Sequence, residues 1–115
     1  MYRPSIKVFE CTVRDGGLIN KHQFSHEFVR EVYKSLTTAG IDYMEIGYKN
    51  SKKLFSPEEY GTWKFCADED IHKVIDGIDS KMKISVMVDI DRVDMDDIKP
   101  ADQSPVDIIR TATYV

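Results

Sequence analysis

An arginine and an aspartate stand side by side where the first strand-like segment ends, in the run Cys11-Thr12-Val13-Arg14-Asp15-Gly16-Gly17. Active sites of α/β proteins lie at the carboxyl ends of parallel strands. There, Asp15 could be an oxygen ligand for a divalent cation, and Arg14 could stabilise an oxyanion or enolate. Gly16 would let the backbone pass close to a ligand. On spacing alone, a surface ion pair ahead of a glycine turn accounts for these residues better.

Glu45 is a second candidate, because it lies inside the otherwise apolar run over residues 41–48. An unpaired carboxylate would be costly in such a strand. Two arrangements would satisfy it: an ion pair with Arg14 at the carboxyl edge of the sheet, which we prefer, or a purely structural hydrogen bond.

The elements expected around these residues alternate between strands and helices. Strands are predicted over residues 6–13, 41–48, 83–90 and 106–114, where β-branched and aromatic residues gather. After the glycine turn, a loop should run to Ser25, the N-cap of an amphipathic helix that Gly40 ends. Further helices are predicted over residues 56–61 and 70–78, with one helical turn over 94–98.

Alternating strands and helices call for a parallel sheet with right-handed crossovers. A (β/α)8 barrel takes about 250 residues, and the chain has 115. The predicted fold class is therefore α/β, a partial TIM barrel with its first four parallel strands. Residues 1–115 would form the N-terminal portion of a single domain. Both edges of such a sheet are unpaired, which favours self-association into a homo-oligomer.

Composition excludes several classes of partner. Sixteen Lys and Arg against 20 Asp and Glu give a formal charge of −4, and there is no basic stripe for nucleic acid or anionic lipid. No apolar run is long enough for a membrane span, and residues 1–10 lack the apolar core of a secretory signal. We therefore expect a cytoplasmic protein, with Cys11 and Cys66 as reduced thiols.

The glycine-flanked Arg-Asp motif closely resembles the strand-one signature of the DRE-TIM metallolyases, the HMGL-like superfamily. Three further stretches resemble its 4-hydroxy-2-oxovalerate aldolase branch: residues 21–24 (KHQF), 40–48 (GIDYMEIGY) and 110–114 (RTATY). They occur in the order expected for that branch. Four matches in order are far more specific than one, and they favour a functional role for Arg14 and Asp15 over a surface ion pair.

The resemblance implies a metal-dependent lyase that cleaves or forms a carbon-carbon bond next to the carbonyl of a small 2-oxo acid. It implies a divalent metal, Mn or Mg, held by Asp15, and an enolate stabilised by Arg14. Glu45 joins Arg14 as a catalytic residue in this hypothesis. Gly16, His22 and Arg110 are assigned to substrate binding, the last two because the matching stretches contain them. A Lewis acid and a neighbouring guanidinium would both lower the energy of the enolate.

Two departures from the aldolase pattern matter. Leu18 stands three residues after Asp15, where the aldolases have their catalytic histidine, so the acid/base residue is missing. The family's His-x-His metal ligands are also absent, and a complete metal site cannot be built from this sequence. We therefore expect the isolated chain to be inactive. The alternative function is a non-catalytic half-barrel that mediates self-association or docks to a partner.

The remaining polar and aromatic clusters have ordinary explanations. The aspartates at 89, 91, 94, 96 and 97 do not fit an EF-hand loop, and a solvated acidic loop explains them, with only Asp89 expected to face the barrel mouth. His22 and His26 flank Ser25 and are expected at the surface. Packing explains the aromatic residues Tyr48, Tyr60, Trp63 and Phe65 better than base stacking does.

Overall fold

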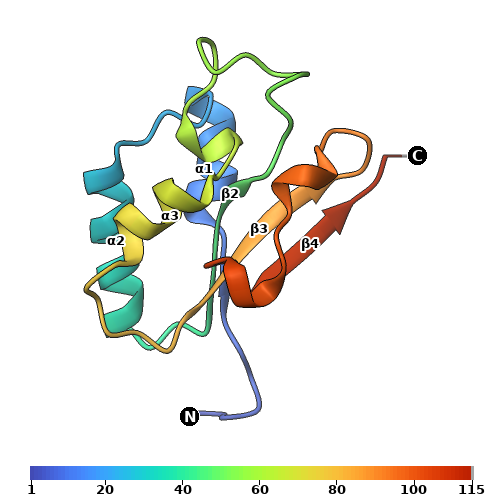
Figure 1. Ribbon diagram of the computed structural model, residues 1–115. Coiled ribbons are helices and arrows are strands. Elements are labelled where there is room, and N and C mark those ends of the chain that lie inside the picture. The colour runs from blue at the N-terminus through green and yellow to red at the C-terminus, as the bar shows by residue number, and fades with distance from the viewer. Residues whose placement is uncertain (115) are drawn as a thin grey trace.

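The computed structural model describes residues 1–114 and contains one sheet of four parallel strands (Figure 1). The strands are β1 (Phe9–Glu10), β2 (Tyr43–Tyr48), β3 (Lys83–Asp89) and β4 (Ile108–Ala112). They lie in chain order, β1-β2-β3-β4, and every neighbouring pair is parallel. A barrel has this sequential order, whereas doubly wound sheets reverse direction near their middle. The predicted α/β class with four barrel-like parallel strands is confirmed.

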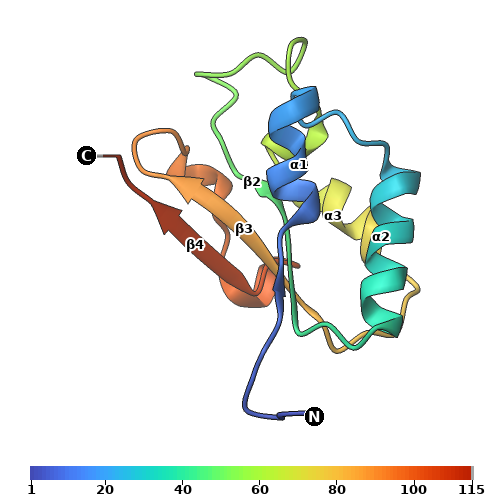
Figure 2. The same cartoon turned by 180° about the vertical axis from the view of Figure 1, so that it is seen from behind.

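Three α-helices accompany the sheet: α1 (Thr12–Asn20), α2 (His26–Thr38) and α3 (Asp68–Ile75). Short 3-10 turns occur at η1 (Thr62–Lys64), η2 (Met95–Asp97) and η3 (Ala101–Gln103). Figures 1 and 2 show the three α-helices gathered on one side, with β3 and β4 extending away from them. None of the helices within residues 1–114 is long and apolar enough to span a membrane.

The hydrophobic core lies between one face of the sheet and the helices α2 and α3. Its buried side chains include Met44, Ile46, Ile84 and Val86 from the strands and Val29, Tyr33, Ile71 and Val74 from the helices. Strand residues alternate between faces, so the residues between these, such as Glu45 and Ser85, point to the opposite face of the sheet. We call that opposite face the inner face, because it would line the interior of a barrel.

Helix α2 follows its sequence signals closely. The Ser25 hydroxyl accepts a hydrogen bond from the backbone N–H of Phe28 at 3.0 Å, as an N-cap does. Gly40 follows the helix with a φ of +76°, which glycine adopts without the steric cost that other residues incur. The predicted start and end of this helix are confirmed.

The segment after β1 differs from the prediction. We expected a strand to Val13 and then a glycine turn and loop, but residues 12–20 form helix α1 and the strand ends at Glu10. The Glu10 carboxylate explains the early start, because it accepts hydrogen bonds from the backbone N–H of Thr12 at 2.9 Å and from the Thr12 hydroxyl. Val13 is thereby turned into the core, fully buried.

The two glycines of α1 therefore serve helix packing rather than a turn. A Cβ added to Gly17 would lie 2.1 Å from Nδ1 of His22, whereas a Cβ added to Gly16 would meet only the Phe24 ring, at 3.5 Å. Gly17 lets the His22 ring pack directly against the helix backbone. The helix ends at Asn20, and the next residue, the C-cap Lys21, has a φ of 56°.

The second difference lies between β2 and α3. The helix predicted over residues 56–61 is a single turn, in which the Ser56 hydroxyl accepts a hydrogen bond from the backbone N–H of Glu58 at 3.2 Å. The helix predicted from residue 70 begins at Asp68 and ends at Ile75, before Gly77 with its φ of +78°. The helical turn predicted over residues 94–98 is present as η2.

Candidate functional site

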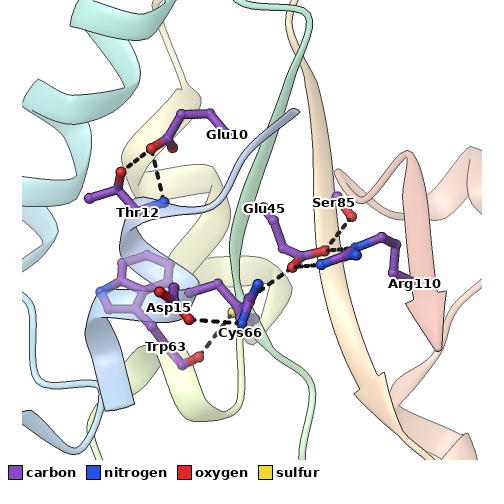
Figure 3. A network of polar contacts seen from close by, with 9 residues as sticks. Glu10, Thr12, Asp15, Glu45, Trp63, Cys66, Ser85 and Arg110 are labelled. Atoms are coloured by element: carbon purple, nitrogen blue, oxygen red, sulfur yellow. Dashed lines mark hydrogen bonds and ion pairs between the residues drawn. The ribbon is translucent and has the colours of Figure 1, made fainter. Parts of the chain in front are cut away.

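The centre of the candidate site is the fully buried carboxylate of Glu45, on the inner face of β2. Arg110 of β4 binds it in a fork, with Nε 2.7 Å from Oε2 and Nη2 2.7 Å from Oε1. Nε of Arg14 donates to Oε1 at 2.9 Å, and the Ser85 hydroxyl donates to Oε2 at 3.1 Å. Figure 3 shows Ser85 reaching Glu45 from the neighbouring strand β3 and Arg110 reaching it from β4, one strand further along the sheet. The preferred pairing of Arg14 with Glu45 is present, and Arg110 joins it.

The charges of this cluster are coupled. Burial alone would raise the pKa of Glu45, but the hydrogen bonds and charge of Arg110, together with Ser85 and Arg14, hold that pKa below its usual range. The pKa of Arg110 is raised, chiefly by its hydrogen bond to Glu45. Two guanidinium groups share the Glu45 carboxylate, and Asp15 at the rim also pairs with Arg14. The Arg110 side chain is 43% exposed and the Arg14 side chain 16%, which leaves the guanidinium of Arg110 open to an anion.

Asp15 lies at the rim of the same site, with its side chain 69% exposed and Oδ1 3.3 Å from Nη1 of Arg14. It lines an open hollow of about 520 Å³ together with Cys11, Thr12, Arg14 and Gly16. Its carboxylate could supply one oxygen ligand to a hard cation. Within residues 1–114, however, no three His, Cys, Asp or Glu side chains converge as a metal site requires. The side chains within residues 1–114 could therefore supply only part of a metal site, with Asp15 as one ligand.

His22 is not at the surface as expected, because its residue is 2% exposed. Its ring lies edge-on to the ring of Tyr48, 5.3 Å between centroids, and Nδ1 has no hydrogen-bond partner among the described residues. Burial, with the nearby charges of Lys64 and Arg14, lowers the pKa of His22 to about 4. The imidazole is therefore neutral, and in this position it contacts Tyr48 rather than the open hollow.

Acidification should destabilise the fold through His22. Between pH 6.5 and about 4 the unfolded chain takes up a proton on this imidazole that the folded chain does not. The free energy of unfolding should therefore fall by up to about 3 kcal/mol as the pH drops through this window. Urea unfolding at pH 7 and pH 4.5 measures the difference. Between these two pH values, the free energy of unfolding of His22→Gln should fall less than that of the wild type. His72→Gln, at an exposed histidine of α3, should show the same fall as the wild type. Equal acid sensitivity in His22→Gln and the wild type would contradict the burial of a neutral imidazole.

The other residues singled out from the sequence lie around this centre. Gly16 is in α1 beside the hollow, and Leu18 is exposed on the same helix. Asp89 is buried at the end of β3, two positions beyond Met87 and four beyond Ser85, which places it on the inner face as expected. His26 is half-buried and lies 2.8 Å from Asp70.

Sequence reasoning missed two buried polar residues near the site. Ser85 belongs to no motif, but a serine in the apolar run of β3 is a signal for a polar partner on the neighbouring strand, here Glu45. Lys64 is also buried, with its ammonium 4.3 Å from the Phe55 ring centroid and 5.2 and 5.1 Å from those of Tyr48 and Tyr60. Tyr48 and Tyr60, two of the four aromatic residues expected to pack, thus lie around a cation.

The sequence is similar to several curated aldolases. A 4-hydroxy-2-oxovalerate aldolase from Moorella thermoacetica is 29% identical over 111 residues, which are 96% of this chain and 32% of the relative. A protein of the same name from Pelotomaculum thermopropionicum is 28% identical over 112 residues, 97% of this chain and 32% of the relative. One from Bacillus cereus is 40% identical over 43 residues, 37% of this chain and 13% of the relative. No family model matches the sequence.

The fold is similar to a solved structure. The N-terminal domain of a provisionally assigned aldolase from Bacteroides vulgatus superposes with a TM-score of 0.72 and 25% identity, over 92% of this chain and 35% of that one. The resemblance to the aldolases found in the motifs is confirmed by both comparisons. The chain spans about a third of the length of the curated relatives it matches over most of its residues.

Proposed function

We propose that residues 1–115, which are similar to about a third of a 4-hydroxy-2-oxovalerate aldolase, are the N-terminal portion of an aldolase-type TIM barrel. The whole protein would cleave or form a carbon-carbon bond next to the carbonyl of a 2-oxo acid. The observation that carries the proposal is the pair of guanidinium groups, Arg14 and Arg110, held by the buried Glu45 on the inner face of the sheet.

The charge of the cluster supports this chemistry. A 2-oxo acid brings a carboxylate, and bond cleavage at its C3 develops negative charge on the carbonyl oxygen. The exposed guanidinium of Arg110 suits the fixed carboxylate, while Arg14, beside Asp15, suits the developing enolate. Glu45 acts as the positioning residue, because it touches both guanidinium groups and is itself out of reach of a substrate.

The proposal includes a divalent cation, Mn or Mg, with Asp15 as one of its ligands. When bound, such an ion acts as a Lewis acid on the 2-oxo acid. Gly16 keeps the backbone beside Asp15 free of a side chain, so that a substrate can approach there. His22, also assigned to substrate binding, would act through Tyr48 because it is buried.

The experiment uses the natural full-length protein that carries this chain. We expect it to release pyruvate from a 4-hydroxy-2-oxo acid in the presence of Mn²⁺, followed with a lactate dehydrogenase coupled assay. Arg14→Lys should lower kcat by about 10²-fold, because a lysine cannot bind Glu45 and face the enolate in the same planar geometry. Asp15→Asn should weaken Mn²⁺ binding measured by electron paramagnetic resonance.

Asp96→Asn is the matched control, since Asp96 belongs to the exposed acidic segment of η2. It should leave both turnover and Mn²⁺ binding unchanged. A wild-type protein that releases no pyruvate and binds no 2-oxo acid would refute the proposed activity. Such a protein, if it also formed a stable oligomer by light scattering, would favour the alternative of a non-catalytic association module.

A further inference from the structure

Tyr48 lies at the carboxyl end of β2 and is turned to the inner face by a β-bulge. Glu45 pairs with Ser85 and Tyr48 pairs with Met87, so three steps along β2 correspond to two along β3. Ser85 and Met87 share a face because they are two residues apart. Without the extra residue in β2, Glu45 and Tyr48 would point to opposite faces. The bulge therefore places the phenol on the same side as the Glu45 cluster.

The Tyr48 ring is held from two directions. The ammonium of Lys64 lies over its face, 5.2 Å from the centroid, and the His22 ring contacts it edge-on at 5.3 Å with an interplanar angle of 76°. These contacts come from η1 and from the segment between α1 and α2, so the ring is fixed by elements outside its own strand. A side chain locked in this way has little rotamer freedom left to lose when it meets a ligand.

The hydroxyl of Tyr48 lies near the guanidinium of Arg14, on the same face of the sheet. A guanidinium can only donate, so toward Arg14 the phenol oxygen can act only as an acceptor, and its own O–H remains available. Burial raises the pKa of Tyr48, with Arg14 opposing in part, so the phenol keeps its proton at neutral pH. Asp89 of β3 and Lys64 of η1 are the other charged groups that face it.

The aldolase-like motif of this chain lacks a residue that can transfer a proton, because Leu18 stands where the aldolases have their catalytic histidine. Resting on the proposed function, we propose that Tyr48 is the catalytic proton donor of this site. Its hydroxyl is near the same arginine that would face the enolate, and no hydrogen bond from it to a protein acceptor is found among residues 1–114, although the Asp89 carboxylate lies nearby.

During cleavage, protons pass only between the substrate, Tyr48 and water, and their number balances. The C3–C4 bond breaks, its electron pair passes to the enolate, and the 4-hydroxyl gives its proton to water to leave an aldehyde. Tyr48 donates its proton to C3, which yields the 2-oxo acid. The phenolate beside Arg14 then takes a proton from the hydronium ion, so that no proton is gained or lost overall.

The test isolates the protonation step from carbon-carbon cleavage. Full-length protein is incubated with pyruvate and Mg²⁺ in D₂O, and exchange of the methyl hydrogens is followed by proton NMR. The wild type should catalyse the exchange, and Tyr48→Phe should slow it by about 10²-fold or more. Phenylalanine keeps the ring that packs against His22 and Lys64, so pyruvate affinity, measured by saturation-transfer NMR, should stay the same.

Tyr60→Phe is the matched control, because Tyr60 also contacts the Lys64 ammonium. It should exchange at the wild-type rate. Wild-type exchange in Tyr48→Phe would overturn the assignment and leave the proposed function standing. A parallel loss of pyruvate binding in Tyr48→Phe would also overturn it, since that indicates a structural role. A wild-type protein that binds pyruvate nowhere and exchanges nothing would remove the proposed function, and this assignment with it.

Discussion

Replacing Glu45 by glutamine is expected to lower the free energy of unfolding by about 3 kcal/mol or more, because it leaves two guanidinium groups facing each other without their shared anion. The substitution keeps the shape of the side chain, so little of the loss comes from packing. Glutamine can accept at one oxygen only, whereas Glu45 accepts from Arg14, Ser85 and Arg110 at two. Urea unfolding of the chain, followed by circular dichroism, measures the change.

Glu59→Gln provides the control for Glu45→Gln. Glu59 also pairs with a cation, Lys21 at 3.3 Å, but both side chains are more than half exposed. Removing such a surface pair should cost no more than about 1 kcal/mol. If the two glutamine variants were equally stable, the buried charge cluster would not hold the sheet together in the way described.

Gly16→Ala and Gly17→Ala should have opposite effects, although the two positions are adjacent in α1. The Gly17 variant places a methyl group 2.1 Å from the buried His22 ring, and such overpacking costs about 1–3 kcal/mol. The Gly16 variant meets its nearest neighbour at an ordinary 3.5 Å, and alanine in a helix gains up to about 1 kcal/mol over glycine. The gain in helix propensity is common to both variants, so their free energies of unfolding should differ by the overpacking cost, about 1–3 kcal/mol.

Thermal or urea unfolding of the two alanine variants gives this difference directly. A Gly17→Ala variant as stable as Gly16→Ala would mean that His22 does not pack against α1. A destabilised Gly16→Ala variant would mean instead that the residues 15–17 need a backbone conformation that helices do not supply.

The fold could be predicted from the sequence wherever periodicity and capping agree. Helix α2 has both an apolar stripe and the Ser25 cap, and β3 is rich in apolar and β-branched residues, so the sequence predicts both to within a few residues. Helix α1 was missed because its Gly16-Gly17 pair is typical of a turn. The burial of Val13 in the core and the contact of His22 with Tyr48 are tertiary contacts, which local sequence does not reveal.

The sequence predicts only part of the candidate site, because some of its contacts join residues that are far apart in the chain. A carboxylate in an apolar strand signals a cationic partner, and that reasoning found Arg14 for Glu45. Arg110 was noted only for its resemblance, because its partner lies 65 residues away. The placement of Tyr48 depends on a bulge, which breaks the two-residue alternation by which faces are assigned to strand residues.

The Glu45 cluster also bears on how the chain folds in time. Its bonds join residues 31, 40 and 65 positions apart in the sequence, and such long loops must close before the contacts can form. Helix α2 can form locally, whereas the cluster needs β2, β3 and β4 to be already aligned. It should therefore be absent from the folding transition state, so that weakening it would speed unfolding while leaving the folding rate nearly unchanged. The charged side chains of the site thus slow the unfolding of a sheet whose assembly is driven by its apolar face.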